Sequence, residues 1–327
     1  MKKALAIVLC LTMVLALAAC GSSGSSASSG APAEEKTYVI GISQLVPHVA
    51  LDAATQGFKD AVDAALGDKV TYIEQNAAGD QPTCTTIANQ LVAENVDLIM
   101  ANATPALQAA ASATTTIPVL GTSVTDYATA LEIDDWTGVT GKNVSGTSDL
   151  APLADQAAMF AELLPDARSI GLLYCSAEPN SIYQANVVDE ILTGQGYSVK
   201  HYTFADTNEV ANVTTSACAN SDALYVPTDN TAATCTETIN NVALPAGVPI
   251  IAGEEGIASG CGIAALTISY YDLGYATGEM AVDILVNGAD ISTMAVRFAP
   301  NVTKKYNPVN CEALGINIPA EYEAIAP

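Results

Sequence analysis

Hydrogen-bonding side chains recur in this sequence directly after short apolar runs that are typical of β-strands. The candidate contacts to a bound molecule in these loops, with the adjacent proline, are Ser43, Gln44, Thr104, Pro105, Thr122, Ser123, Thr125, Asn180, Asp229, Asn230 and Glu254. Hydroxyl, amide and carboxylate groups can orient a small polar molecule by hydrogen bonds. Ligands of open α/β sheets bind beyond the carboxyl ends of the strands, so these loops predict a recognition site.

Catalytic motifs are missing from the sequence. It contains no HExxH, no GxSxG and no closely spaced Cys–His pair, and the side chains of the adjacent Glu254 and Glu255 diverge. No Gly-rich phosphate cradle follows the first apolar run, which argues against a nucleotide. There is no CxxC and no His at zinc-ligand spacing from a Cys. We therefore predict that the protein is not an enzyme and uses no cofactor or metal.

The elements that position these loops follow from an alternation of strand and helix patterns. Tyr38 to Ile42 is a strand run, and from Ala50 small and apolar residues recur at three- and four-residue steps, as in an amphipathic helix. Further strands are expected at 69–75, 97–101, 117–121, 169–174, 197–204, 222–226, 248–251, 262–269 and 295–299. Further helices are expected from 104 and at 81–94, 149–163, 180–194, 209–219, 231–242, 270–287 and 307–314. This order predicts an α/β fold of right-handed parallel βαβ units in two consecutive sets.

Composition and charge narrow the function classes. The formal net charge is −24 and half of the residues are hydrophobic. Such an acidic chain repels nucleic acid and anionic lipid headgroups, so we expect no nucleic-acid partner. The length after the N-terminal segments suggests two domains with sizeable cores.

The N-terminus reads as an export signal. Lys2 and Lys3 precede an apolar run that ends in Leu-Ala-Ala-Cys20. This resembles the bacterial lipoprotein signal, so we expect a signal peptide at 1–19 and a lipidated Cys20. Residues 20–36 then form the lipidated Cys and a flexible Ser/Gly tether. The protein would be lipid-anchored at the extracellular face of the cell membrane; an ordinary cleaved signal with an incidental Cys is the alternative.

Six cysteines remain beyond Cys10 and Cys20, namely Cys84, Cys175, Cys218, Cys235, Cys261 and Cys311. An even number in an exported protein is compatible with disulfides, but free buried thiols are an equal alternative. Cys218 and Cys235 are the favoured pair if any bridge forms.

Six stretches in this order carry a family resemblance: GISQLVPHVALDAATQGF, LIMANATPALQAA, IPVLGTSVTDY, LYVPTDNT, IAGEEG and YYDLGYATGEMA. Together they resemble the substrate-binding components of ABC importers with the type I periplasmic-binding-protein fold, especially the group associated with tryptophan and other aromatic amino acids. The resemblance implies two Rossmann-like lobes, joined by three crossover hinge strands, that close on a ligand. The expected lobes are 37–143 plus 261–291 and 144–260 plus 292–327. It also implies a separate permease and ATPase as partners, and a monomer.

For an amino-acid ligand, the loops divide into two sets. The helix N-termini after Asn102 and Gly121 would receive the carboxylate through backbone N–H groups, with hydroxyls of Thr122, Ser123 and Thr125 as further donors. Thr104 is either an N-cap or a ligand contact, and Gln44 either a ligand contact or a turn residue.

The ammonium needs an acceptor from the second lobe. Asp229 is the first candidate, with a plain helix N-cap as its alternative; Glu254 and Glu255 are second choices. Ser176, Asn180 and Ser181 are placed to seal the cleft.

An apolar slot for an aromatic ring would use Pro105, Val46 or Tyr183, which simple packing would also explain. Trp136 is expected at the surface or a hinge, and His48 at a helix start, with tuning of a pH response as its alternative. The predicted function is capture of an aromatic amino acid such as tryptophan for an importer. A ligand-sensing receptor, or an importer component for a branched-chain amino acid, sugar or nucleoside, is the alternative.

Overall fold

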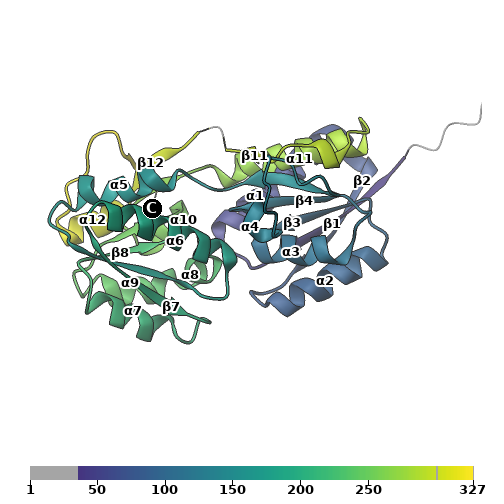
Figure 1. Ribbon diagram of the computed structural model, residues 1–327. Coiled ribbons are helices and arrows are strands. Elements are labelled where there is room, and N and C mark those ends of the chain that lie inside the picture. Colours follow the sequence, from purple (N-terminus) through teal and green to yellow (C-terminus); the bar gives the residue numbers. More distant parts are fainter. Residues whose placement is uncertain (1–35, 300, 327) are drawn as a thin grey trace, which may run out of the picture. The chain divides into compact units, whose positions relative to one another are not determined.

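The computed structural model describes residues 36–299 and 301–326 (Figure 1). The expected signal peptide, Cys20 and nearly all of the tether lie outside the described residues. None of the described helices is long and apolar enough to cross a membrane.

The first sheet is parallel throughout and has the strand order β11-β5-β4-β3-β1-β2. Its strands are β1 (Tyr38–Gln44), β2 (Val70–Asn76), β3 (Leu98–Asn102), β4 (Val119–Val124), β5 (Val144–Ser148) and β11 (Arg297–Phe298). Every residue of β3 and β4 is buried. Continuously buried strands are expected where helices cover both faces of a parallel sheet.

The helices on this sheet are α1 (Val49–Leu66), α2 (Gln81–Ala93), α3 (Thr104–Ala113), the single turn α4 (Tyr127–Ala130) and α11 (Tyr270–Leu285), with 3-10 turns at Gly67–Lys69 and Ile291–Thr293. One core holds Phe58 of α1 and Met280 of α11 against one face of the sheet. Another holds Leu91 of α2 and Leu107 of α3 against the opposite face (Figure 1). We call this sheet with α1 to α4 and α11 the first lobe.

The second sheet has the order β13-β12-β10-β9-β8-β6-β7. Its strands are β6 (Ser169–Cys175), β7 (Ser198–Phe204), β8 (Ala223–Val226), β9 (Ile250–Ala252), β10 (Ala264–Thr267), β12 (Thr303–Tyr306) and β13 (Glu323–Ala324). β12 runs antiparallel to β10 and pairs with β13. Neither β12 nor β13 was predicted, because the polar run of β12 lacks the apolar pattern of the central strands.

The helices of the second lobe are α5 (Leu153–Leu163), α6 (Pro179–Gly194), α7 (Val210–Cys218), α8 (Asn230–Thr234), α9 (Thr236–Ala243), α10 (Glu255–Gly260) and α12 (Pro308–Leu314). Two cores again lie on opposite faces: one includes Phe160 and Val188, the other Val210 and Ile239. The single helix predicted at 231–242 is two helices that meet at Cys235, where the backbone leaves helical geometry.

α1 and α11 pack so closely that the backbone of each helix lies against the backbone of the other. A Cβ atom at Gly274 would lie 1.9 Å from the carbonyl oxygen of Ala54, and one at Gly57 would lie 2.1 Å from that of Tyr271. Only glycine permits such an approach. The two helices therefore form one closely packed pair on the first sheet.

The chain passes between the lobes later than predicted. Strand pairing keeps β5 in the first sheet and β10 in the second, so the crossings follow Ser148 and Thr267 rather than Asn143 and Cys261. β11 pairs with β5, so the last crossing follows Phe298, and the predicted strand at 295–299 does not belong to the second lobe. These three predicted boundaries were wrong, because sheet membership depends on pairing across the chain.

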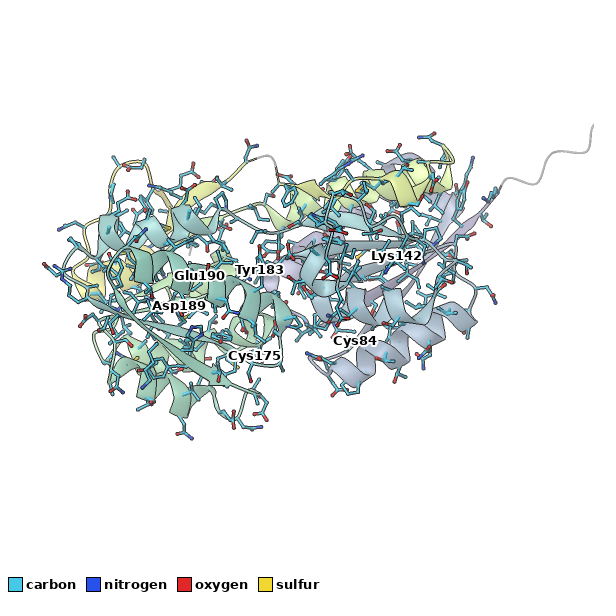
Figure 2. All side chains as sticks on the ribbon, viewed as in Figure 1. Cys84, Lys142, Cys175, Tyr183, Asp189 and Glu190 are labelled. Atoms are coloured by element: carbon cyan, nitrogen blue, oxygen red, sulfur yellow. The ribbon has the colours of Figure 1, made fainter. Side chains whose placement is uncertain are left out.

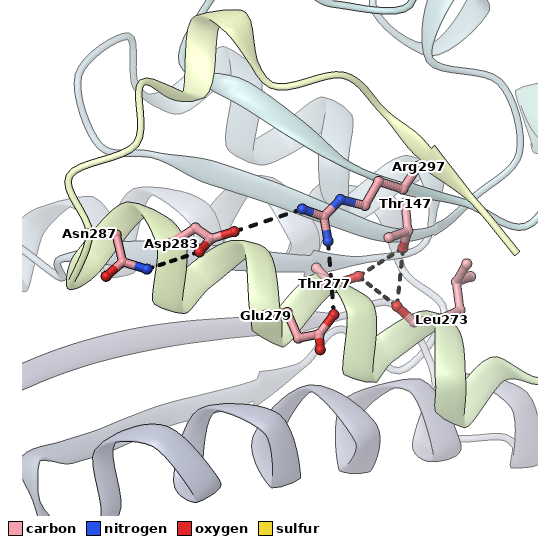
Figure 3. A network of polar contacts seen from close by, with 7 residues as sticks. All are labelled: Thr147, Leu273, Thr277, Glu279, Asp283, Asn287 and Arg297. Atoms are coloured by element: carbon pink, nitrogen blue, oxygen red, sulfur yellow. Dashed lines mark hydrogen bonds and ion pairs between the residues drawn. The ribbon is translucent and has the colours of Figure 1, made fainter. Parts of the chain in front are cut away.

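Polar contacts tie the crossing segments to α11 (Figure 3). Oγ1 of Thr147 on β5 lies 2.8 Å from Oγ1 of Thr277. Arg297 on β11 lies 3.9 Å from Glu279 and 3.8 Å from Asp283. The ends of β5 and β11 are thereby anchored on one helix of the first lobe.

Candidate functional site

Of the seven buried side-chain atoms without a hydrogen-bond partner among the described residues, four lie at the strand ends of the first sheet. These four are the hydroxyls of Ser43, Thr104 and Ser123 and the amide oxygen of Asn102, and another of the seven is Oδ1 of Asn180 from the second lobe. Most buried polar atoms in folded proteins are paired, so a group of unpaired ones needs a reason. A bound polar molecule would supply one.

The same loops carry unusual backbone. Ala103 has φ 92° and Ser123 has φ 54°, in the region that favours glycine. Each such residue costs of order 1–3 kcal/mol, and such strain concentrates at functional sites. The turn at Ser123 also shifts the register between β4 and β5, which sets Val124 opposite Ser148.

The N-terminus of α3 is buried and has no side-chain cap. Ala103 precedes it, Thr104 is its first residue and Pro105 follows. Of the two alternatives for Thr104, the N-cap is therefore wrong, and its hydroxyl remains unpaired. Free N–H groups and the positive end of the helix dipole make this terminus suited to an anion.

The second predicted helix terminus is different. β4 continues to Val124, and the single turn of α4 is capped by Asp126, whose Oδ1 accepts from the N–H of Thr129 at 2.7 Å. The expectation of a free N-terminus after Gly121 was wrong, because the strand is longer than its apolar run.

Three predicted residues in the first lobe are engaged within the protein. Gln44 donates to Oδ1 of Asp52 at 2.6 Å and to the carbonyl of Val46 at 3.0 Å, and it accepts from Thr55 at 2.7 Å. Thr122 accepts from the Thr147 hydroxyl at 3.3 Å. Thr125 donates to Oδ1 of Asp149 at 3.0 Å.

Asp229 is the N-cap of α8. Oδ1 accepts from the N–H of Ala232 at 2.7 Å and Oδ2 from that of Cys175 at 2.6 Å. Burial, and then the nearby Glu178, raise its pKa to about 7. The N-cap role of Asp229 is confirmed, and its contact with a ligand stays a prediction.

Glu178, which the sequence analysis missed, organises the loops of the second lobe. Its carboxylate accepts from the amide of Asn180 at 3.1 Å, from the side chain of Asn230 at 2.7 Å and from the hydroxyl of Thr231 at 2.7 Å. Because the amide nitrogen of Asn230 donates to Glu178, the amide oxygen points away from Glu178 and is available as an acceptor. That oxygen lies 3.2 Å from Nε2 of His48 in the first lobe.

Glu254 caps α10 through the N–H groups of Gly256 and Ile257. Burial is the main cause that raises its pKa to about 7. Glu255 instead pairs with Lys305 at 2.7 Å. Ser176 is exposed and donates to a backbone oxygen of β7, whereas Ser181 is fully buried.

An inner chamber is lined by loop and helix-start residues from both lobes. Its lining residues are His48, Leu51, Ser123, Thr125, Asp149, Asn180, Thr228, Asp229, Asn230, Ala233, Glu254 and Tyr270. Its free volume is about 10 Å³, room for one water-sized group, so its side chains nearly fill it. Three carboxylates line it, and none of the described lining residues is Lys or Arg.

Asp149 and Tyr270 were also missed. The signal for Asp149 is an acid directly after the hydroxyl-rich run of β5, a segment whose pattern predicts an extended connection and a helix start instead of a strand. Burial raises the pKa of Asp149, although hydrogen bonds from Tyr270 and Thr125 oppose this. Burial also lowers the pKa of His48, the residue before α1.

An outer cavity of about 450 Å³ adjoins the chamber at Asn230, which lines both. Val46 and Pro105 line it from the first lobe, as the slot hypothesis required. Tyr183, on α6 (labelled in Figure 2), is not among the lining residues and packs against a core of the second lobe. Trp136 is partly buried, and its ring stacks on Tyr127 with centroids 6.5 Å apart.

The six cysteines are free thiols, so the hypothesised Cys218–Cys235 bridge is not present. Cys84 packs in a core of the first lobe and Cys175 in a core of the second (Figure 2). The described residues contain no group of His, Cys, Asp and Glu suited to a metal ion.

Comparisons with known proteins agree with this architecture. Residues 39–326 match the family model of the ABC transporter substrate binding protein. The curated tyrosine-binding protein of Clostridioides difficile is 37% identical over 254 residues, which cover 77% of this chain and 73% of that protein.

Two solved structures resemble the chain over most of its length. The ABC domain from Streptococcus pneumonia in complex with L-Trp is 33% identical, with a TM-score of 0.84 over 89% of this chain and 100% of that one. A ligand-free, open substrate-binding protein with adhesive properties from Clostridium difficile is 36% identical, with a TM-score of 0.68 over 88% of this chain and 99% of that one. The predicted α/β fold of two parallel-dominated sheets is confirmed, and the chain belongs to the family of ABC transporter substrate-binding proteins.

Proposed function

We propose that this protein captures an aromatic L-α-amino acid between its lobes and delivers it to the permease of an ABC importer. The observation that carries the proposal is one chamber in which the unpaired hydroxyl of Ser123 faces three buried carboxylates, with no Lys or Arg among the described lining residues. A zwitterion satisfies both sets, since its carboxylate accepts hydrogen bonds and its ammonium donates them.

The carboxylate of the ligand binds at the strand ends of the first lobe. The uncapped N-terminus of α3 supplies N–H groups, and Ser43, Thr104 and Ser123 supply unpaired hydroxyls. Charge-assisted hydrogen bonds of this kind are shorter and stronger than neutral ones. They would also offset the backbone strain at Ala103 and Ser123.

The aromatic ring occupies the outer cavity. Its volume of about 450 Å³ is in the usual range for small-molecule sites. Val46 and Pro105 present apolar surface to the ring. The relatives that bind tyrosine and L-Trp support an aromatic side chain over an aliphatic one.

Entry of the ligand requires the lobes to separate, because a chamber of about 10 Å³ cannot admit an amino-acid head group. Rotation at the three crossings would open it, as in hinge closure around ligands. The protein performs no chemistry on the ligand and acts as a monomer, while the permease and its ATPase are separate chains.

Lipidation of Cys20 holds the protein at the extracellular face of the cell membrane, and the segment up to residue 36 tethers the lobes there. Cells expressing the full chain should incorporate labelled fatty acid into it. Cys20→Ser should abolish the label and release the protein from the membrane fraction; a label retained by this variant would contradict the anchor.

Calorimetry on residues 36–327, unfolded and refolded to remove carried ligand, tests the ligand class. We expect micromolar or tighter binding of L-tyrosine or L-tryptophan, and at least tenfold weaker binding of L-leucine, ribose and uridine, about 1.4 kcal/mol per factor of ten. Preferential binding of ribose, uridine or leucine would overturn the aromatic ligand while leaving the family membership intact.

A further inference from the structure

Three carboxylates line the inner chamber, but they are not equivalent. Asp229 and Glu254 direct their oxygens to backbone N–H groups, where they cap α8 and α10. Asp149 caps no helix. Its Oδ1 accepts from the hydroxyl of Thr125 at 3.0 Å and its Oδ2 from that of Tyr270 at 2.9 Å.

Hydroxyl partners leave Asp149 adaptable. Each carboxylate oxygen has two lone pairs, so both can accept a further donor beside the hydroxyl. The Thr125 and Tyr270 hydroxyls can also rotate to other acceptors. Asp149 is therefore the acid of the chamber that can receive an ammonium without loss of a helix cap.

An unpaired donor lies beside this acid. The Ser123 hydroxyl is buried, has no hydrogen-bond partner and lines the same chamber. The register shift of β4 against β5 brings the two together, and the N–H of Asp149 donates to the carbonyl of Val124 at 3.2 Å. An α-amino acid carries its carboxylate and ammonium on one carbon, so it needs a donor and an acceptor side by side.

The location of Asp149 links this contact to lobe movement. Asp149 follows β5, where the chain leaves the first sheet, and Tyr270 begins α11, where the chain returns from β10. The Tyr270–Asp149 bond thus joins two crossings whose residues are 121 positions apart. A charge that binds Asp149 acts directly on the segments about which the lobes rotate.

We propose that Asp149 is the carboxylate that receives the ammonium group of the ligand, and that this contact at the crossings selects α-amino acids over acids without an amine. The assignment rests on the proposed function. Asp229 and Glu254 then contribute as helix caps and as background negative charge.

Paired ligands and conservative variants test the assignment. The probes are L-tyrosine, L-tryptophan and their analogues without the amine, 3-(4-hydroxyphenyl)propanoate and 3-(indol-3-yl)propanoate, with calorimetry on wild type, Asp149→Asn and Asp149→Glu. We expect Asp149→Asn to weaken binding of the preferred amino acid by about thirtyfold or more, because it removes one partner of a buried charge pair. Binding of the matching analogue should change less than about threefold, since hydrogen bonds to an uncharged group contribute little net free energy.

Asp149→Glu keeps the charge and should keep the preference for the amine, which makes the test independent of the folding of Asp149→Asn. Equal preference for the amine in wild type and Asp149→Asn would overturn the assignment and move the ammonium to Asp229 or Glu254. Loss of that preference in Asp149→Glu, with the fold intact by circular dichroism, would show that a negative charge at this position does not select the amine and would also overturn the assignment. Failure of the wild type to bind any of the four probes would instead overturn the proposed function.

Discussion

Nε2 of His48 lies 3.2 Å from Oδ1 of Asn230, and this bond joins the start of α1 in the first lobe to the start of α8 in the second. Because the Asn230 amide nitrogen donates to Glu178 at 2.7 Å, its oxygen faces His48 as an acceptor. His48 must therefore donate through Nε2. The bond closes the chamber between the two lobes.

Removal of this bond should shorten the lifetime of the complex. Asn230→Ala removes this bond and the donation to Glu178, so we expect it to raise the ligand dissociation rate at least about five- to tenfold, the value of one net hydrogen bond, with little change in the association rate. Stopped-flow measurements that follow the fluorescence of Trp136 would resolve the two rates. Asn89→Ala, on the exposed surface of α2, is the matched control, and His48→Gln, which retains a donor, should stay near the wild-type rate. An unchanged dissociation rate in Asn230→Ala would contradict a role for the bond in closure.

Binding should depend on pH through the buried carboxyls. The pKa of Glu254 and that of Asp229 are both raised to about 7, so the ligand-free folded protein keeps protons that the unfolded chain releases near pH 4. Their contribution to the free energy of unfolding is thus complete below about pH 4 and is lost as the pH rises to about 7.

An ammonium ligand prefers the ionised carboxyls, which reverses the sign for affinity. We expect affinity for the amino acid to rise about tenfold between pH 6 and pH 8, with proton release on binding near pH 6.5. Calorimetry in buffers of different ionisation enthalpy measures both quantities. A constant affinity from pH 5.5 to 8 would show that no carboxyl of the chamber changes ionisation on binding.

Replacement of the unpaired Thr104 hydroxyl should change ligand affinity and the free energy of unfolding in different ways. Thr104→Val keeps the shape of the side chain and removes a buried, unpaired hydroxyl, so the free energy of unfolding should stay the same or rise by about 1 kcal/mol. Affinity for the ligand should nevertheless fall about five- to tenfold. Thr277→Val is the matched control: its hydroxyl is paired with Thr147 and Leu273, so it should lose stability and keep its affinity. Denaturant titration and calorimetry on both variants would reveal whether this opposite pattern holds.

The contact between α1 and α11 should be intolerant of a single methyl group. Gly274→Ala would place a Cβ 1.9 Å from the carbonyl oxygen of Ala54, and we expect a loss of about 3 kcal/mol in the free energy of unfolding. Gly194→Ala, at the exposed end of α6, meets no atom within 4 Å and should gain about 0.5 kcal/mol. Urea titrations that gave the two variants equal stability would refute the close approach of the helices.

The sequence predicted the alternating elements well because each βαβ unit is encoded locally, by apolar runs such as Tyr38 to Ile42 and by the helical stripe that follows. It also identified the positions of the unpaired groups, since Ser43 and Ser123 lie at strand ends, and Thr104 and Asn180 lie at the starts of helices that follow strands. It could not identify Asp149 and Tyr270, because their proximity depends on which sheet β5 and β10 join. It did not predict the bonds of Gln44 to Asp52 and Thr55, because these partners lie on a helix whose orientation depends on packing.

The backbone contact between α1 and α11 should make the two helices move together as one rigid unit. One helix begins beside His48 and the other at Tyr270, and Ala50 and Tyr270 share one cluster of buried residues. A shift of one helix start is therefore transmitted to the other. The effects on ligand affinity of substitutions at the His48–Asn230 contact and at the Tyr270–Asp149 contact should therefore be non-additive, although no bond joins the two pairs. A change of ligand preference in relatives of this protein would have to accommodate both contacts at once.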